Sequence, residues 1–151
     1  MSIAPTLKRY LTAENIQYEE IPHELTMSST RTAEECHVSG DRLAKGIVLR
    51  RDGAYMLAVM PASHHLRLPE LRTKPMANEA EINRLFRDCA HGAIPAVGKC
   101  YGLETIVDDS IGAQQDIYME AGDHETLLHL THAQFARLTA NAPHGRFSAH
   151  D

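Results

Sequence analysis

The sequence contains no tryptophan, and aromatic residues make up only 5% of it. A surface that stacks the bases of single-stranded nucleic acid needs several exposed aromatic rings, so such a platform is not expected. Basic residues are also few, because 15 Lys and Arg stand against 20 Asp and Glu and give a net charge of −5. This balance excludes the extended positive stripe that binds DNA, but it is compatible with a contact to the end of an RNA.

Cysteines are scarce and long hydrophobic runs are missing. The three cysteines, Cys36, Cys89 and Cys100, form no CxxC pair and are odd in number, which indicates reduced thiols in a cytosolic protein. No apolar stretch reaches the roughly 20 residues of a membrane span, and the first residues lack a signal-peptide pattern. We therefore expect a cytoplasmic protein with no membrane partner. The 151 residues fit one globular domain with one core.

The Asp52-Gly53 pair lies between two apolar runs and predicts a two-residue hairpin turn. This turn would place Lys45 opposite Met60 and Leu49 opposite Met56. Both surfaces of the hairpin are largely apolar near its base, so we expect the sheet to be covered on two sides.

Cap and turn signals divide the rest of the chain into helices and strands. Helices are expected to begin at Pro5, near Thr32, at Leu68, after Asn78 and after Thr131, and strands at 17–21, 102–108, 116–121 and 126–130, with a frayed tail from Asn141. Short turns between successive strands predict an α+β fold with a mixed, mainly antiparallel sheet and flanking helices.

Lys45 lies in a strand whose other residues are apolar. Period-2 alternation places it on the same face as Ile47, beside Met60. A buried ammonium group is costly unless it is paired, and burial lowers its pKa. The lysine could instead pack its stem and extend its ammonium group to water. The small neighbours Ala44 and Gly46 leave room for a ligand, so both interpretations stay open.

The segment from Gly92 to Gly98 reads GAIPAVG. Glycine permits positive φ and close backbone approach, and Pro95 stiffens the turn. A loop of this kind can present several backbone N–H groups to an oxyanion or a phosphate. An ordinary connection between a helix and a strand can have the same composition, so the pattern alone does not decide between the two.

The ten histidines and the cysteines suggest two further chemistries. His124, His129 and His132 form the best histidine cluster, but their spacing matches neither HExxH nor a Cys/His framework. We therefore predict surface histidines and no metal or cofactor. Cys89 lies near His91, but residues so close in sequence rarely form a working nucleophile and base.

Several segments follow one another in a distinctive order. His23 in a loop is followed by a capped helix, the strand AKGIVL, the element LPEL, the loop GAIPAVGKCYGL and the segment IYMEAG. This order resembles the YbaK/EbsC and prolyl-tRNA synthetase-associated domain family over about residues 15 to 140. The resemblance implies a mixed α+β fold around a barrel-like sheet. It also implies removal of wrongly attached amino acids from tRNA.

The resemblance implies site residues as well. Lys45 falls on the strand lysine of the family and Gly92 on the glycine that begins its substrate loop, so both are expected to be catalytic. The expected substrate-binding residues are His23, Met60, Ile94, Pro95, Ala96, Val97, Gly98, Asp116, Gly122 and His124. The family often has a Gly-x-x-x-Pro pattern, whereas this chain has Ala96 at that place and its proline at residue 95. This departure changes the expected loop geometry and amino-acid preference.

The expected reaction is hydrolysis of the ester that joins an amino acid to the terminal ribose of a mischarged tRNA. Loop amides would polarise the ester carbonyl, and Lys45 would position the terminal nucleotide or the aminoacyl group. The resemblance implies that the ribose hydroxyl of the substrate activates the water. Met60, with Met56, Ala58 and Ile94, would limit the size of the side chain. This mechanism requires Lys45 and the glycine loop to line one cavity.

The expected partner is the acceptor end of a mischarged tRNA, with or without an aminoacyl-tRNA synthetase. A competing interpretation is a binding module that recognises an aminoacyl group or a nucleotide without turnover, which Ala96 favours. A third interpretation is a metal-dependent hydrolase that uses His124 and His129.

Overall fold

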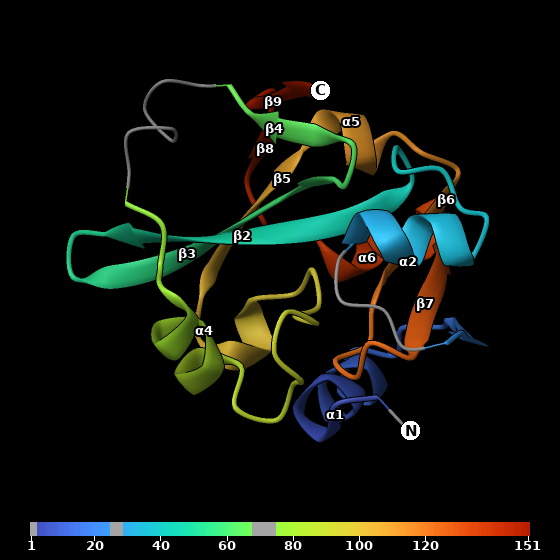
Figure 1. Ribbon diagram of the computed structural model, residues 1–151, viewed down its shortest axis with the longest axis horizontal. Helices are drawn as coiled ribbons and strands as arrows, with labels where there is room; N and C mark the ends of the chain where they lie inside the picture. Colours follow the sequence, from blue (N-terminus) through green and yellow to red (C-terminus); the bar gives the residue numbers. More distant parts are fainter. Residues whose placement is uncertain (1–2, 25–28, 68–74) are drawn as a thin grey trace.

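The computed structural model describes residues 3–24, 29–67 and 75–151 of the chain (Figure 1). Its helices are α1 (Pro5–Ala13), α2 (Ser29–Glu35), α4 (Glu79–Leu85), α5 (Asp109–Gly112) and α6 (His132–Leu138), with a short 3₁₀ helix η1 (Lys99–Tyr101). Its strands are β1 (Glu19–Pro22), β2 (Leu43–Arg51), β3 (Ala54–Pro61), β4 (His64–Leu66), β5 (Glu104–Asp108), β6 (Asp116–Glu120), β7 (Thr126–Thr131), β8 (His144–Gly145) and β9 (Ser148–His150).

The described strands form one large mixed sheet and one small sheet. The large sheet has the order β1-β7-β6-β2-β3-β5-β8, and the small one pairs β4 with β9. Antiparallel pairs join β1 to β7, β7 to β6 and β2 to β3, whereas β6–β2, β3–β5 and β5–β8 are parallel. The α+β prediction is confirmed. The large sheet is open at β1 and β8, so the described strands do not close into a barrel.

The β2–β3 hairpin has the register that its turn predicts. Lys45 pairs with Met60 and Leu49 with Met56. Asp52 and Gly53 have φ values of 46° and 80°. Positive φ at both central residues is the geometry of a type I′ turn, which matches the twist of the flanking strands.

The two faces of this hairpin contribute to different cores. The main core includes Val48 and Leu57 and extends under α1, where Leu7 and Leu11 are fully buried. The second core lies on the opposite face and consists of Leu49, Met56, Ala58, Met60 and Phe147. Figure 1 shows α1 and α4 on one side of the hairpin and β4 and β9 on the other. The prediction that the sheet is covered on two sides is confirmed.

Two of the three predicted caps are present. The Asn78 side chain accepts a hydrogen bond from the Glu81 amide and closes a capping box at α4. The Thr131 hydroxyl accepts from the Gln134 amide at α6. The third prediction is wrong, because α2 begins at Ser29 and Thr32 lies inside the helix, where it is fully buried.

The tail is ordered, which corrects the prediction of fraying from Asn141. β8 pairs with β5, β9 pairs with β4, and Phe147 between them is buried in the second core. The amides of Phe147 and Ser148 both donate to the Asp108 carboxylate, at 2.7 and 3.0 Å. The helix predicted at 68–71 lies outside the described residues. Among the helices that are described, none has the length and apolar character needed to cross a membrane.

Candidate functional site

Lys45 is half-buried on β2 and bonds to the backbone of the β3–β4 connection. Its ammonium group donates to the carbonyl oxygens of Ala62, at 3.2 Å, and of His64, at 2.6 Å. Burial lowers the pKa of Lys45, and the negative charge of Asp151 opposes this effect. Two of the three N–H donors of the ammonium group are thus used by the protein.

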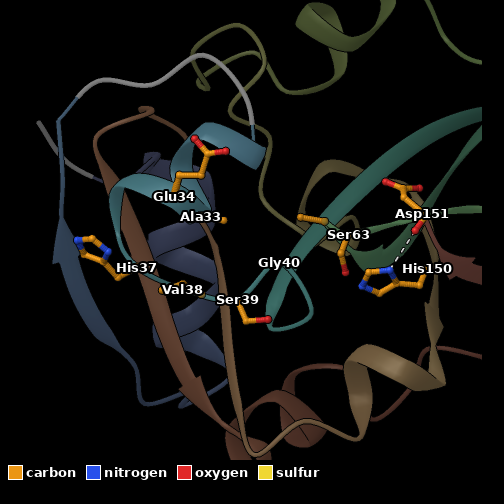
Figure 2. Close-up of a pocket in the computed structure, with 10 residues that line it drawn as sticks. Ala33, Glu34, His37, Val38, Ser39, Gly40, Ser63, His150 and Asp151 are labelled. Carbon is orange, nitrogen blue, oxygen red and sulfur yellow. Dashed lines mark hydrogen bonds between the residues drawn. The ribbon is translucent and has the colours of Figure 1, made fainter.

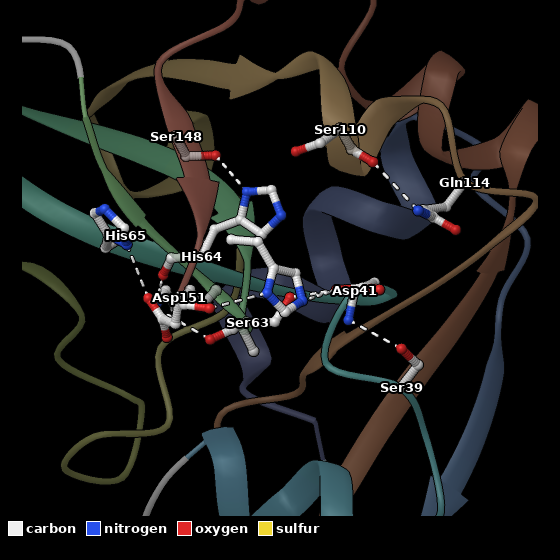
Figure 3. A network of polar contacts seen from close by, with 12 residues as sticks. Ser39, Asp41, Ser63, His64, His65, Ser110, Gln114, Ser148 and Asp151 are labelled. Carbon is white, nitrogen blue, oxygen red and sulfur yellow. Dashed lines mark hydrogen bonds and ion pairs between the residues drawn. The ribbon is translucent and has the colours of Figure 1, made fainter.

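Polar side chains around Lys45 form a partnered network, which we call the lysine corner (Figure 3). It comprises Lys45 and the pairs Asp41 with Ser63 (2.5 Å), Asp41 with His150 (3.1 Å), His64 with Ser148 (2.9 Å) and His65 with Asp151 (2.9 Å). These contacts join β2, β4 and β9, which lie far apart in the sequence. The lysine corner therefore fixes the tail to the sheet.

An open groove of about 700 Å³ adjoins the lysine corner (Figure 2). Ala33 and Glu34 of α2 line one side, and Ser63, His150 and Asp151 line the other. The groove also touches Ala62, whose carbonyl oxygen bonds to Lys45. A ligand in this groove would lie close to the ammonium group.

The glycine loop has backbone amides without protein acceptors. Gly92 has a φ of 79°, and the Ala93 amide donates to the Ala90 carbonyl at 3.0 Å. The amides of Ile94, Ala96 and Val97 have no acceptor among the described residues. Ala96 and Val97 are buried, and a buried N–H group without a partner is unusual in a folded protein. Such amides can bind an oxygen of a ligand.

The end of the glycine loop packs on the face of β2 opposite to the one that carries Lys45, and a cavity shared by Lys45 and the start of the loop remains a prediction. Ala96 and Val97 pack in the main core with Val48, whereas Lys45 lies on the face of Ile47. The alternation of side chains along β2 enforces this separation.

Met60 does not line an open cavity either. Its side chain is fully buried in the second core with Phe147. It exposes no surface to a ligand, so the expectation that it contacts substrate is corrected. Ile94 is half-buried at the margin of the main core, so the prediction that it limits the size of the amino-acid side chain stands.

The β6–β7 turn holds the start of the glycine loop. Gly122 has a φ of 106°, and its carbonyl accepts the Ala90 amide at 2.7 Å. A Cβ at this position would lie 2.8 Å from the Cβ of Ala4, so the close approach requires glycine. His124 has a φ of 61°, and its Nε2 makes a short hydrogen bond to the carbonyl of His91. The turn thus brings Gly122 and His124 to the residues that precede Gly92.

The buried residues Glu120 and His124 at the end of β6, with the half-buried His23 that follows β1, form a second polar group, which we call the acceptor cluster. The side chains of Glu120 and His124 are 6% and 4% exposed, and Glu120 Oε2 lies 4.0 Å from His124 Nδ1. His124 Nδ1 and His23 Nε2 are buried without a hydrogen-bond partner among the described residues.

Burial raises the pKa of Glu120 to about 7. The Thr32 hydroxyl and His23 act in the opposite direction, and Asp123 adds to the rise. The Thr32 hydroxyl reaches the carboxylate from α2 and acts on it as a hydrogen-bond donor. Desolvation of the charged carboxylate is therefore the dominant effect.

The acceptor cluster and the lysine corner lie on the same side of the sheet. β2 and β6 are paired in parallel at Leu43 with Tyr118 and at Ala44 with Met119. Continuing this register by one residue places Lys45 opposite Glu120, on the face of Leu43 and Tyr118. The ammonium group of Lys45 turns toward β4, so the two polar groups lie on either side of β2.

Asp116 lies away from this site. It begins β6, whereas Glu120 ends the strand, and its carboxylate bonds to His129 Nε2 at 2.8 Å. His129 also contacts Glu19, at 3.2 Å. Asp116 therefore holds β6 and β7 to β1, and its contact with substrate remains a prediction.

The histidines do not converge. His132 Nδ1 lies 3.1 Å from the Gln114 carbonyl, whereas His129 contacts Asp116 and His124 contacts His91. Within the described parts of the chain, no three His, Cys, Asp or Glu residues are placed to hold a metal ion.

Cys89 lacks the features of a nucleophile. Burial raises the pKa of its thiol to about 11, which disfavours the reactive thiolate at neutral pH. Its Sγ contacts the hydroxyl of Tyr101 at 3.4 Å, and His91 contacts Asn83 instead.

These features define an α+β domain with an amide-lined loop at the edge of a mixed sheet. A model of the aminoacyl-tRNA editing domain matches residues 23–138, and the chain belongs to that family. The comparison with curated protein sequences finds no match.

Solved structures share the fold at low sequence identity. A hypothetical protein is 21% identical with a TM-score of 0.79, and the match covers 95% of this chain and 99% of that one. A protein provisionally described as a trans-editing enzyme for prolyl-tRNA synthetase is 19% identical with a TM-score of 0.75, covering 98% and 99%. A third structure is of a protein from Marinobacter aquaeolei VT8 that is provisionally described as a signal transduction protein. It is 18% identical with a TM-score of 0.73, and the match covers 95% of this chain and 30% of that one.

Sequence reasoning did not find Glu120 or Thr32 as site residues. One signal was available, because alternation in IYMEAG puts Glu120 on the face of Tyr118, which faces α2.

Proposed function

We propose that this protein is an aminoacyl-tRNA deacylase that hydrolyses the ester of mischarged tRNA. Membership of the editing-domain family supports this class of substrate. The amide donors of the glycine loop support the reaction, because ester hydrolysis passes through a tetrahedral oxyanion that such donors stabilise.

The unpartnered amides of the loop are the observation that carries the proposal. Ile94, Ala96 and Val97 supply donors in a segment stiffened by Pro95, with Gly92 and Gly98 at its ends. His124 anchors the residue before Gly92. Donors held in place in this way lose little free energy to reorganisation during the reaction, and each is worth about 3 kcal/mol in other enzymes.

Lys45 would contact the nucleotide and not the reacting carbonyl. Its remaining N–H donor is suited to a ribose or phosphate oxygen that enters along the groove. No side chain in the described site has the environment of an activated nucleophile, so the ribose hydroxyl of the substrate is the proposed activator of water. Ile94 would limit the size of the amino-acid side chain.

The acidic surface implies that another protein assists in holding the tRNA. A net charge of −5 gives weak attraction to the tRNA body. We propose an aminoacyl-tRNA synthetase as this partner, while the domain itself binds the acceptor end.

The test is a deacylation panel with tRNAs mischarged with Ala, Cys, Ser and Pro. Wild type should release at least one of these amino acids, and Lys45→Ala should lower kcat/KM by about 10-fold or more, because a hydrogen bond from a charged group to the nucleotide is worth about 1.5–3 kcal/mol. Lys8→Ala, which removes an exposed lysine on α1, is the matched control and should be unchanged. Normal rates in a folded Lys45→Ala protein would refute its role.

A non-catalytic binding module is the second candidate. The departure of this chain from the Gly-x-x-x-Pro pattern at Ala96 favours it. Retained binding of a hydrolysis-resistant aminoacyl-adenosine, with no release from any tRNA in the panel, would support this candidate over the deacylase.

A further inference from the structure

A second groove, of about 710 Å³, adjoins the end of the glycine loop. Its walls come from α1, α6, β5, η1 and residues 139–143, and Arg51 at the end of β2 also lines it. It shares no lining residue with the groove beside the lysine corner, and Lys45 takes no part in it. We call this cavity the basic groove. The proposed function assigns it no ligand.

The apolar part of its lining belongs to the margin of the main core. Val97 and Leu103 are buried in that core, and Leu138 and Ala142 pack against it while remaining partly exposed. Cavities of several hundred Å³ with a largely apolar surface and a few polar groups are typical of sites for small organic molecules. The basic groove is therefore suited to a ligand with an apolar body.

Three basic side chains line the same groove: Arg51, Lys99 and Arg137. They come from β2, η1 and α6, and all three residues are exposed. Two carboxylates, Glu14 and Glu104, also take part, so the lining has one more positive charge than negative in a chain whose net charge is −5. This local reversal of sign favours an anionic ligand.

The donors of these cations are largely unused. Lys99 has no hydrogen bond or ion pair within the part of the chain that the structure describes. Arg137 Nε donates to the backbone carbonyl of Glu14 at 3.3 Å, which holds the guanidinium group at the groove and leaves its terminal nitrogens for a ligand. Arg51 lies 3.7 Å from Glu104, but these side chains are 51% and 79% exposed, so the ion pair is weak.

A hydroxyl without a partner lies where the glycine loop meets β5. Thr105 Oγ1 is buried and makes no hydrogen bond to the described residues, and a Cβ at Gly98 would lie 2.5 Å from it. Glycine at this position therefore lets the loop close onto β5. Both residues line the basic groove, and a buried hydroxyl that the fold leaves unpaired is uncommon in folded proteins.

We propose that the basic groove binds a nucleoside phosphate, either free or as the terminal unit of an RNA strand. A phosphate group has several charged oxygens, so it accepts hydrogen bonds from more than one of the three cations. The flat, largely apolar base covers the apolar surface beside them. The inference goes beyond the proposed function, because it assigns a ligand to a cavity that excludes Lys45.

Other ligand classes match the basic groove less well. A single carboxylate has two oxygens and is satisfied by one guanidinium group, which leaves the other cations without an acceptor. A cationic ligand would meet an excess of like charge. An uncharged apolar molecule would desolvate the charged groups of the rim without replacing their hydrogen bonds to water.

The first experiment measures which parts of the ligand are needed. Calorimetry compares adenosine 5′-monophosphate with adenosine, which lacks the phosphate, with ribose 5-phosphate, which lacks the base, and with inorganic phosphate. The wild type should bind the complete nucleotide at least about 10-fold more tightly than each of the three fragments, because each fragment loses one of the two contacts.

The second experiment places the ligand in the groove. Lys99→Ala and Arg137→Gln should each weaken binding of the nucleotide about 10-fold, because each removes a hydrogen bond from a charged group. Lys8→Ala removes the same charge from an exposed position of α1 outside the groove and should leave the affinity unchanged. Circular dichroism checks that the three variants fold.

The trinucleotide CpCpA, with which tRNA ends, distinguishes the two sources of the ligand. Binding of CpCpA at least as tightly as the mononucleotide supports the site and assigns it to the end of an RNA. Binding of the mononucleotide about 10-fold more tightly than CpCpA supports the site and assigns it to a free nucleotide.

Four results would overturn the inference. Binding of neither nucleotide would remove the site, and equal affinity for inorganic phosphate would show attraction of any anion. Unchanged affinity in both Lys99→Ala and Arg137→Gln would place the nucleotide elsewhere. An equal loss in Lys8→Ala would reduce the effect to overall charge. None of these measurements uses an aminoacyl ester, so failure of the deacylase function in the tRNA panel is a separate result.

Discussion

The lysine corner and the acceptor cluster both place charged groups on the same side of one sheet. They differ in how well those charged groups are hydrogen-bonded. In the lysine corner, Lys45 donates to two carbonyl oxygens and the surrounding side chains are paired with one another. In the acceptor cluster, Glu120 is more deeply buried, and the Thr32 hydroxyl offsets only part of the desolvation that raises the pKa of its carboxyl group.

The difference separates a stabilising group from a destabilising one. Partnered polar groups contribute to stability, whereas a buried carboxylate whose lost hydration is only partly replaced costs free energy in the folded protein. The rest of the fold must offset that cost.

The largest expected effect on stability is in the lysine corner. Lys45→Ala removes the donor from two carbonyl oxygens and should lower the free energy of unfolding by about 2 kcal/mol, since each lost partner costs about 1 kcal/mol or more. Urea titration by circular dichroism measures this, with Lys8→Ala as the control. An unchanged unfolding midpoint would show that the corner does not stabilise the fold.

The acceptor cluster should respond in the opposite direction. Glu120→Gln should raise the free energy of unfolding by about 2 kcal/mol at pH 8: the raised pKa corresponds to about 3.5 kcal/mol at about 1.4 kcal/mol per unit, and the cost of burying the glutamine amide offsets about 1.5 kcal/mol of it. The pKa of Glu120 is about 7 in the folded protein, against 4.5 for an unperturbed glutamate. An acid with a raised folded pKa costs stability as the pH rises from 4.5 to about 7, and the cost is constant above that range.

At pH 4 both states of the wild type hold the proton, so the advantage of Glu120→Gln should vanish. Urea titrations at pH 4 and pH 8 test this difference. His23, His124 and Asp123 face or influence the same carboxylate, so Asp123→Asn serves as the control for a general charge effect. A Glu120→Gln protein that is less stable than wild type at pH 8 would contradict the expectation that the buried Glu120 carboxylate destabilises the fold.

The smallest effect is expected at the exposed rim of the lysine corner. Asp151→Asn removes the ion pair with His65, in which both side chains are more than half exposed. Exposed pairs contribute little because water and salt screen them. The urea midpoint should stay within experimental scatter. A clear loss would extend the structural role of the corner to its rim.

Local signals in the sequence were sufficient for the hairpin but not for the tail. Asp52-Gly53 fixes a turn type, and one turn type fixes the register of the whole β2–β3 pair. β8 and β9 have two and three residues, too few for a period to be visible. Their stability comes from burial of Phe147 and from the Asp108 carboxylate, which are contacts between distant parts of the chain.

The candidate site was predictable in its parts and not in its arrangement. Alternation assigns Lys45 to the face of Ile47, and the composition of the glycine loop suggests free amides. Neither pattern says which face of the sheet the loop packs on. Glu120 is the last residue of β6, and in the sequence alone such a residue is expected to be exposed to solvent. Only the position of α2 in the fold accounts for its burial.

His124 adopts a left-handed backbone that glycine would adopt more easily, with a φ of 61°. This conformation costs a residue with a side chain about 1 kcal/mol, and glycine at that position would avoid the cost. Only an imidazole can contact the backbone before the glycine loop through one nitrogen and face Glu120 with the other. A screen for thermostable variants should therefore enrich glycine or asparagine here, and the enriched variants should lose the contact between residue 124 and the His91 carbonyl.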